Sequence, residues 1–153
     1  MPLTSCTRVA LILLALTPFS AASAGDWSSY GGDPGGMRHV SASQITAANV
    51  DQLTQAWVYR TGHLSAPTAD IQQSKFEVTP ILVEGKLALC TPFNQVMALD
   101  PASGKQLWRF DAQIKLGYRP ANLFNCRGVS YWQDSAAATG QACRSRLFMG
   151  TMD

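Results

Sequence analysis

Residues 78–110 read VTPILVEGKLALCTPFNQVMALDPASGKQLWRF, and the fold class follows from this stretch. Four short runs of apolar and β-branched residues are separated by turns that contain Gly, Pro, Asn and Asp. This alternation predicts strands joined by tight turns. The expected strands are 78–83, 87–90, 95–99 and 106–110. They form an antiparallel meander, which is one blade of a propeller or one sheet of a sandwich.

The residues before the meander are less regular. Residues 25–45 are rich in Gly, Ser and Asp, and we expect an extended leader packed by Trp27 and Tyr30. Thr46 is a candidate N-cap for a short helix. The expected elements of this region are a helix within 43–53, a β-rich run over 55–61 and a polar loop over 63–75.

Two more strands are expected after the meander, at 127–132 and 146–150, with loops at 113–125 and 133–143. The ten-residue helical patterns that would interleave strands in an α/β fold are missing from the sequence. The last strand runs into residue 153 without a closing turn or cap. A lone edge strand is prone to aggregation, so we expect a truncated chain.

The first 24 residues have the composition of a secretory signal peptide. Arg8 precedes the apolar run 9–16, Pro18 interrupts it, and Ala22-Ser23-Ala24 offers small residues for cleavage before Gly25. The run is too short to cross a hydrocarbon core of about 30 Å. We therefore expect a periplasmic mature chain without a transmembrane span, soluble or peripheral to the inner membrane.

The composition argues against a nucleic-acid partner. The chain has 153 residues and a net charge of +2, and its basic residues are scattered singly. It therefore lacks the basic patch that nucleic-acid binding requires. Paired carboxylates, nucleophile elbows and phosphate-binding loops are also missing from the sequence.

The cysteines predict one disulfide. Cys6 leaves with the signal peptide, so three cysteines remain in an oxidising compartment and at most one bridge can form. Cys126 and Cys143 bracket a polar segment rich in Ala and Gly, and we predict that they pair. Cys90 lies in an apolar run and is expected as a buried thiol.

Residues 98–108, ALDPASGKQLW, resemble the tryptophan-docking motif of propellers of the pyrroloquinoline quinone (PQQ) type. Asp100 can accept backbone hydrogen bonds across the turn, and Gly104 can take a positive φ. Trp108 is then expected to lie flat between neighbouring blades and to bury roughly 200 Å². Non-catalytic propeller scaffolds share this motif, so it indicates the fold more than the chemistry.

Further segments resemble PQQ-dependent alcohol and glucose dehydrogenases. They are Glu77-Val-Thr-Pro-Ile81, Asn125-Cys-Arg-Gly-Val-Ser-Tyr-Trp132 and a leader with Trp27, Tyr30-Gly31, Arg38, Ile45, Asn49-Val50, Leu53 and Trp57. The resemblance implies an all-β fold, a partial β-propeller made of the first blades of an eight-bladed quinoprotein propeller. Cys before Arg, with another Cys downstream, is similar to the membrane-type glucose, quinate and polyol branch. The implied division is signal peptide 1–24, leader with a first outer strand 25–75, and blades 76–153.

The resemblance implies that Glu77, Arg127 and Thr151 contact PQQ. Arg127 can pair with a carboxylate of this tricarboxylated quinone, and Thr151 can donate one hydrogen bond. Glu77 is expected as an acceptor oriented by its neighbours or by a nearby metal. The alternatives are an inter-blade salt bridge for Arg127, a solvated strand-end charge for Glu77 and a structural role for Thr151. His39 and His63 lack partners at metal-ligand spacing and are expected at the surface.

This sequence departs from the glucose-type pattern in one hairpin. Those enzymes often carry His, then Asn or Gln, then Arg after a Cys-Thr pair, whereas Phe93, Asn94 and Gln95 stand here. Loss of the His removes a polar contact near the cofactor and weakens an assignment to glucose. The glucose-type enzymes also usually begin with several membrane helices, in place of the signal peptide found here.

The resemblance implies an enzyme that oxidises a small alcohol: a sugar, a polyol or a cyclic hydroxy acid. Hydrogen and electrons pass to PQQ, which the protein orients, and then to a membrane quinone. Ligands for calcium or magnesium and an aspartate base are expected beyond Asp153, so no catalytic residue is assigned here and the chain alone is expected to be inactive. The alternative is a non-enzymatic PQQ-like scaffold of the periplasm, which would have no reason to hold Arg127 toward the propeller axis.

Overall fold

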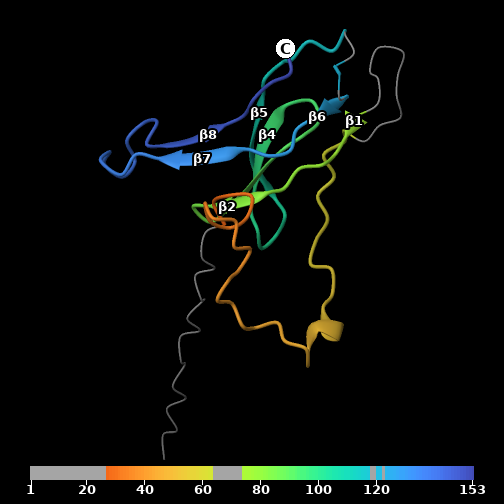
Figure 1. Ribbon diagram of the computed structural model, residues 1–153, viewed down its shortest axis with the longest axis vertical. Coiled ribbons are helices and arrows are strands. Elements are labelled where there is room, and N and C mark those ends of the chain that lie inside the picture. The colour runs from red at the N-terminus through yellow and green to blue at the C-terminus, as the bar shows by residue number, and fades with distance from the viewer. Residues whose placement is uncertain (1–26, 64–73, 118–119, 122) are drawn as a thin grey trace, which may run out of the picture.

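The computed structural model describes residues 27–63, 74–117, 120–121 and 123–153, and in these residues strands predominate (Figure 1). A single turn of 3₁₀ helix is the only helical element of this part. The all-β architecture expected from the sequence is therefore confirmed. In chain order the elements are η1 (Val50–Gln52), β1 (Ser74–Lys75), β2 (Ile81–Val83), β3 (Lys86–Cys90), β4 (Gln95–Leu99), β5 (Gln106–Asp111), β6 (Phe124–Asn125), β7 (Ser130–Gln133) and β8 (Ser145–Phe148).

The predicted meander is present as a four-stranded antiparallel sheet with the order β2-β3-β4-β5. Ala88 pairs with both neighbouring strands, opposite Ile81 on one side and Ala98 on the other. The first strand begins at Ile81 rather than at Val78. Pro80 has no N–H to donate to a ladder, and the N–H of Thr79 instead donates to the carbonyl of Arg127 at 3.0 Å.

Two tight turns join the first three strands. Glu84 and Gly85 have φ values of 48° and 68°, the positive values that a two-residue primed turn requires. Asn94 closes the next turn at φ 52°, and its N–H donates to the carbonyl of Thr91 at 3.0 Å. Asn tolerates this left-handed conformation better than most residues with a side chain.

The turn before β5 has the geometry that its motif predicts. The carboxylate of Asp100 accepts hydrogen bonds from the N–H and the hydroxyl of Ser103 at 2.7 and 2.6 Å, and these bonds lower its pKa. Gly104 has φ 70°. Trp57 lies against the turn and donates its indole N–H to the carbonyl of Pro101 at 3.0 Å. A Cβ on Gly104 would lie 2.5 Å from the Trp57 ring.

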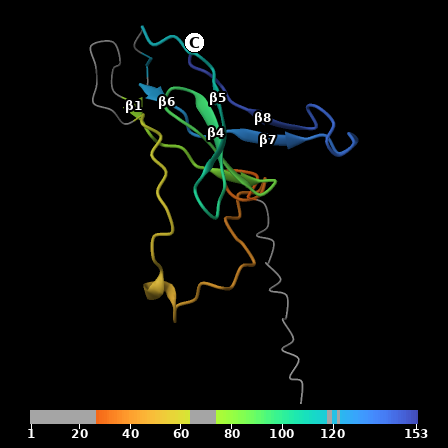
Figure 2. The same ribbon diagram turned by 180° about the vertical axis from the view of Figure 1, so that it is seen from behind.

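The sheet buries both of its faces. On one face, Ile81, Val83, Ala88, Cys90 and Val96 form a core with Cys126 and Val129, against which Leu147 and Met149 pack. On the other face, the cluster of Leu89, Met97 and Leu99 is covered by Trp57 and Tyr59. The sheet thus lies between the leader and the segment that contains β7 and β8, as a blade lies between its neighbours (Figure 2).

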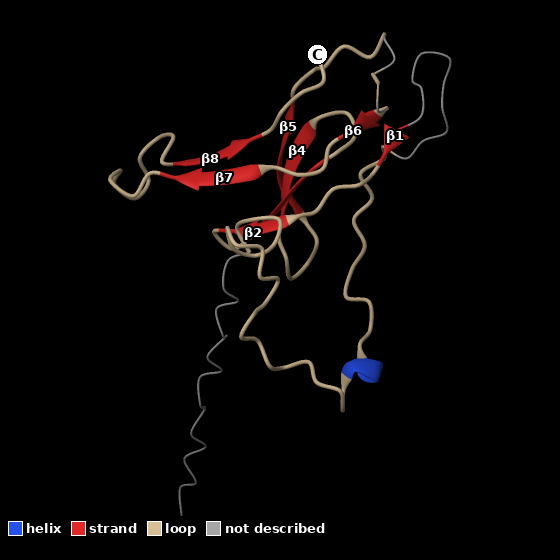
Figure 3. Ribbon diagram, viewed as in Figure 1, coloured by secondary structure: helices blue, strands red, loops and turns tan. Residues whose placement is uncertain are grey.

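Two smaller sheets flank this blade (Figure 3). β1 and β6 pair in parallel through Ser74 and Phe124. β7 and β8 form an antiparallel hairpin whose strands pair from Ser130 opposite Phe148 to Gln133 opposite Ser145. The strands predicted near 127–132 and 146–150 are therefore present, shifted by a few residues.

The β2–β3 turn is tied to the β7–β8 hairpin by Glu84. Its carboxylate accepts hydrogen bonds from the Tyr131 hydroxyl and the Gln133 amide, both at 3.0 Å, and from the Ser145 hydroxyl. The Ser145 bond is the largest cause that holds the pKa of Glu84 below its ordinary value. One carboxylate thus joins the blade to the strands that follow it.

The predictions for the leader were partly wrong. The expected helix is reduced to η1, and its N-cap position is occupied by Asn49 instead of Thr46. The Thr46 N–H donates to the Asn49 side chain at 2.7 Å, and the Thr46 carbonyl accepts the Val50 N–H at 3.0 Å, so Thr46 begins a turn that stops after Gln52. Tyr30 does not pack the leader, because it is 64% exposed with the Arg38 guanidinium 4.9 Å above its ring. Trp27 does pack, and it exchanges backbone hydrogen bonds of 2.8 and 2.9 Å with Leu82.

The β-rich run at 55–61 forms no strand. Its aromatic residues contact the sheet through side chains, as when the Tyr59 hydroxyl bonds Gln106, rather than through a backbone ladder. Within the described residues no helix is long and apolar enough to span a bilayer. The predicted signal peptide and most of the loop at 63–75 lie outside the described residues.

Candidate functional site

Several chain segments meet at one end of the four-stranded sheet. Because the strands are antiparallel, the start of β2, the β3–β4 turn and the end of β5 lie at the same end of the sheet. We call this end, with the segments that pack on it, the turn end. The segment 125–129 joins it beside Thr79, and the residues after β8 join it through Asn94.

Glu77 and Arg127 meet at the turn end, although they are 50 positions apart in the sequence. The Arg127 guanidinium lies 3.3 Å from the Glu77 carboxylate. The Asn125 amide donates to the same carboxylate oxygen at 2.7 Å. Asn125 and Arg127 therefore orient Glu77, while its contact with PQQ stays a prediction. The salt bridge considered as an alternative for Arg127 is also present, but the Arg127 side chain remains 82% exposed and can still face a ligand.

The disulfide prediction was wrong. Cys90 and Cys126 form the bridge, with their Cα atoms 6.0 Å apart, and Cys143 is a free, exposed thiol. The β-sheet brings the end of β3 beside the segment 125–129, which is 36 positions away in the sequence. Sequence proximity favoured Cys126 and Cys143, but the packing of both Cys90 and Cys126 in one buried cluster determines the pairing.

Thr151 follows β8 and does not share the contacts of the Glu77–Arg127 pair. It is exposed and lines a hollow of about 510 Å³ together with Phe110 and Trp108. The preceding residue, Gly150, is held at the turn end because the Asn94 amide donates to its carbonyl at 3.3 Å. The structure therefore brings the three predicted cofactor residues to one end of the fold, but only two of them into contact.

His63 was wrongly placed at the surface, whereas His39 is exposed as expected. The His63 ring is half-buried, 5.5 Å from the ring of Phe93, and Phe93 lies 5.5 Å from Phe124. Burial, and then the positive charge of Arg109 at 3.2 Å, lower the pKa of His63. The sequence offered no signal for this placement, because its neighbours come from distant segments.

Among the described residues, three buried polar atoms at the turn end have no hydrogen-bond partner within this part of the chain: His63 Nδ1, Asn94 Oδ1 and Asn125 Oδ1. Such atoms are rare in folded proteins, and each needs an explanation. Asn94 and Asn125 were not among the predicted site residues. Asn125 lies beside Cys126 in a segment that carried the resemblance, and that was a signal in the sequence. Asn94 lies in the hairpin that departs from the glucose-type pattern, so the resemblance did not point to it.

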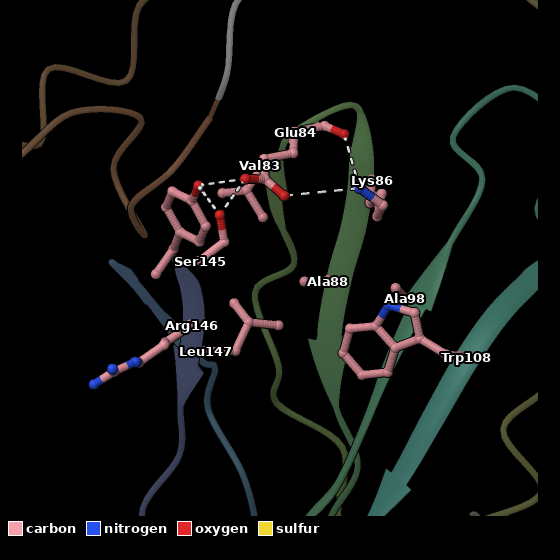
Figure 4. Close-up of a pocket in the computed structure, with 10 residues that line it drawn as sticks. Val83, Glu84, Lys86, Ala88, Ala98, Trp108, Ser145, Arg146 and Leu147 are labelled. Atoms are coloured by element: carbon pink, nitrogen blue, oxygen red, sulfur yellow. Dashed lines mark hydrogen bonds and ion pairs between the residues drawn. The ribbon is translucent and has the colours of Figure 1, made fainter. Parts of the chain in front are cut away.

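Trp108 faces the gap between the blade and the next strands. It lines a hollow of about 250 Å³, with Ala88 and Ala98 on one side and Leu147 of β8 on the other (Figure 4). The indole is 39% exposed. The ring of Trp108 points across the face of the sheet toward β8, which is the direction that docking between blades requires. Full burial of the ring stays a prediction.

The described residues contain no group of three or more His, Cys, Asp or Glu side chains that could hold a metal ion. Besides the Glu77 carboxylate and the His63 imidazole, the turn end offers an arginine, amide groups and aromatic rings. These groups suit an organic anion with a flat ring system better than a metal ion.

Comparison with known proteins agrees with this chemistry. The family model described as PQQ glucose/ethanol/alcohol dehydrogenase, beta-propeller domain, matches residues 27–153. The chain is 40% identical over 131 residues to the glycerol dehydrogenase large subunit of Gluconobacter oxydans (strain 621H), covering 84% of this chain and 17% of that protein. It is 42% identical over 111 residues to the quinoprotein glucose dehydrogenase of Escherichia coli (strain K12), covering 72% of this chain and 14% of that protein.

Two other relatives extend the comparison. Identity is 33% over 144 residues to the quinate/shikimate dehydrogenase (quinone) of Acinetobacter baylyi (strain ATCC 33305 / BD413 / ADP1), covering 84% of this chain and 17% of that protein. The crystal structure of the quinohemoprotein alcohol dehydrogenase from Comamonas testosteroni superposes with a TM-score of 0.52 at 30% identity, covering 69% of this chain and 15% of that one. The chain thus spans less than a fifth of these relatives. Residues 27–153 match the family model, and they contain a four-stranded antiparallel blade. The chain therefore belongs to the PQQ-dependent glucose/ethanol/alcohol dehydrogenase β-propeller family.

Proposed function

We propose that this chain supplies the first blades of a PQQ-dependent dehydrogenase that oxidises a sugar, a polyol or a cyclic hydroxy acid. Relatives named as glycerol, glucose and quinate/shikimate dehydrogenases support this substrate class. The chain matches only 17% of the first of them, so the remaining blades would come from sequence that follows residue 153. The protein with these blades is called the complete protein below.

The observation that carries the proposal is the guanidinium of Arg127 at the turn end. It is 82% exposed while one edge is held by Glu77, so its remaining N–H donors can face a ligand. PQQ carries three carboxylates, and arginine binds a carboxylate through two parallel hydrogen bonds. Glu77 cancels part of the local positive charge and fixes the direction of the guanidinium.

The other groups at the turn end fit the same cofactor. The unpartnered Oδ1 atoms of Asn94 and Asn125 can accept a hydrogen bond, for which PQQ offers its ring N–H. His63 Nδ1 can donate to a carboxylate or carbonyl of PQQ in the tautomer that carries its proton there. Thr151 can add one hydroxyl donor. Bound PQQ would supply a quinone that accepts hydrogen and electrons from the substrate carbon, while the protein residues orient it and exclude water.

Two parts of the chemistry are proposed for later residues. Catalysis in this class needs a general base, and a base contributes roughly 10²–10⁴ in rate. We assign neither that base nor calcium or magnesium ligands to this chain, and we propose that the blades after Asp153 supply them. The predicted signal peptide 1–24 supports a periplasmic site of action, with a membrane quinone as the electron acceptor.

The test is to reconstitute the complete protein with PQQ and Ca²⁺ and to assay glycerol, glucose and quinate with an artificial electron acceptor. Turnover that depends on PQQ supports the proposal. Arg127→Ala should raise the dissociation constant of PQQ by roughly 10- to 100-fold, as loss of a hydrogen bond to a charged group implies. Arg146→Ala is the matched control, because Arg146 lies on β8 with its guanidinium over the Trp132 ring instead of beside Glu77. A folded protein that binds no PQQ would instead be the non-enzymatic scaffold.

A further inference from the structure

The Cys90–Cys126 disulfide lies directly behind the proposed cofactor residues. Cys90 ends β3 and is fully buried, and Cys126, also buried, immediately precedes Arg127 in the chain. The bridge therefore attaches the arginine segment covalently to an inner strand of the blade. A disulfide stabilises a protein mainly by restricting its unfolded chain. This disulfide also restrains the position of the Arg127 side chain.

Both residues next to Cys126 bind Glu77. Asn125 donates to the Glu77 carboxylate at 2.7 Å, and Arg127 pairs with it at 3.3 Å. The Arg127 carbonyl accepts the Thr79 N–H at 3.0 Å. Any displacement of Cys126 would move both partners of Glu77 together, so the disulfide restrains the whole arrangement.

Regular structure alone restrains this segment little. Residues 126–129 lie between the two-residue strand β6 and the start of β7, and they belong to no strand. Arg127 itself is largely exposed, so packing does not fix its side chain. A binding group must be held by its supporting groups to within about 0.5 Å to act well, and the covalent link provides that support.

We propose that the Cys90–Cys126 disulfide is a positioning element for PQQ, which acts by holding Arg127 and Glu77 in their binding arrangement. The inference rests on the proposed function. It assigns to the disulfide a role in cofactor affinity in addition to its role in stability. Cys143, which is exposed and unbridged, is given no such role.

The experiment is a double-mutant cycle in the complete protein, with PQQ affinity measured by fluorescence titration and apoprotein stability measured by urea unfolding. The disulfide is removed by the pair Cys90→Ala and Cys126→Val, which keeps the volume of the buried site nearly constant. Cys143→Ser is the matched control. Each is made with Arg127 present and with Arg127→Ala.

With Arg127 present, removal of the disulfide should raise the dissociation constant of PQQ roughly 10- to 100-fold, by analogy with the loss of groups that orient the ligands of a metal ion. With Arg127→Ala, the same removal should change the dissociation constant by less than about twofold, since the effect acts through the arginine. Cys143→Ser should change neither quantity. The stability loss of the apoprotein should be equal in both backgrounds.

An equal loss of PQQ affinity in the two backgrounds would overturn the inference, because the disulfide would then act only through general stability. An unchanged affinity in folded, disulfide-free protein would overturn it as well. If the pair fails to fold, the single variant Cys126→Ala is measured in the same cycle with the same criteria. A wild-type protein that binds no PQQ would refute the proposed function itself, an outcome that is distinct from both.

Discussion

Glu77 is a carboxylate at a site proposed to bind a tricarboxylate, and its contacts explain why it can stand there. Arg127 and Asn125 both bind it, so its charge is matched before any ligand arrives. A carboxylate in this position fixes an arginine that would otherwise move freely in solvent. The main effect of the Glu77–Arg127 pair is therefore to orient the guanidinium, rather than to attract the anionic cofactor.

Gly104 is restricted both by its backbone conformation and by the nearby Trp57 ring. Substitutions at Gly104 and at a second glycine can separate the two effects. Its φ of 70° disfavours any side chain, and a Cβ would lie 2.5 Å from the Trp57 ring. Gly104→Ala in the complete protein should therefore lose about 2–4 kcal/mol of unfolding free energy, from left-handed strain and overpacking together. Urea unfolding followed by tryptophan fluorescence measures this loss.

Gly85 is the matched control for Gly104. It has φ 68° but nothing within 4 Å of an added Cβ. Gly85→Ala should therefore lose only the conformational part, about 1–2 kcal/mol. Equal losses at the two glycines would show that the Trp57 contact does not constrain the turn.

Trp108 tests the relation between this blade and its neighbour. It is 39% exposed in this chain and faces Leu147 across the hollow of Figure 4. In the complete protein Trp108→Ala should cost about 3–5 kcal/mol, as truncation of a buried aromatic does. Tyr30→Ala, at an exposed leader position, should cost much less. A loss below about 1 kcal/mol for Trp108→Ala, by denaturant melts, would argue against docking between blades.

At the scale of secondary-structure elements, the hairpin turns add polar contacts to the apolar core that joins the blade to the strands that follow it. In the β3–β4 turn, the Asn94 amide donates a hydrogen bond to the Gly150 carbonyl. In the β2–β3 turn, the Glu84 carboxylate accepts hydrogen bonds from the β7–β8 hairpin. Both turns therefore bind the strands that follow the blade through side-chain hydrogen bonds.

Glu84 should make the contact between the β2–β3 turn and the β7–β8 hairpin sensitive to pH. Its pKa is lowered in the folded chain, chiefly by the Ser145 hydroxyl, so its stabilising effect is complete above the ordinary carboxyl pKa. The effect is lost as the pH falls through the lowered folded pKa. At pH 7, Glu84→Gln should destabilise the complete protein by less than about 1 kcal/mol, because the carboxylate is partly exposed and solvent screens its interactions.

The difference in unfolding free energy between wild type and Glu84→Gln should shrink toward zero as the solution is acidified. Urea unfolding at a series of pH values measures it. Asp51→Asn, at an exposed carboxyl on η1, is the control and should show no such trend. A difference that stays constant with pH would mean that the charge of Glu84 does not hold the hairpin.

At the scale of the whole molecule, the blade is covered on both faces but not along β5. Every residue of β5 is exposed, including the large side chains Leu107, Trp108 and Phe110. Figures 1 and 2 show the chain end beside the upper part of β5. A propeller protects such surfaces by packing blades around a closed ring.

We therefore expect the isolated 25–153 polypeptide to bind PQQ weakly or not at all and to show no dye-linked dehydrogenase activity. The cofactor would need contacts from blades that this polypeptide does not contain, as well as the proposed base and metal ligands. Purified polypeptide is mixed with PQQ and Ca²⁺ and assayed with glycerol, glucose and quinate. A cofactor-only blank is the control, and turnover above it would show that the chain forms a self-contained site.

The sequence by itself determined the meander, its turns and the motif around Asp100, Gly104 and Trp108. These features depend on neighbouring residues: strand-forming side chains, and turns in which Gly and Asn take positive φ values. Glu77 and Arg127 could be selected from short motifs for the same reason. The 3₁₀ turn at 50–52 shows the limit, because the helix predicted within 43–53 is reduced to this single turn.

Only the tertiary structure decided which distant residues meet. The partner of Cys126 is Cys90, because the sheet brings β3 beside the arginine segment, and the nearer Cys143 stays exposed. The burial of His63 and the contact of Asn94 with Gly150 likewise depend on segments far apart in the sequence. Local patterns specify strands and turns, whereas disulfide partners and unpartnered buried atoms depend on how those strands pack against one another.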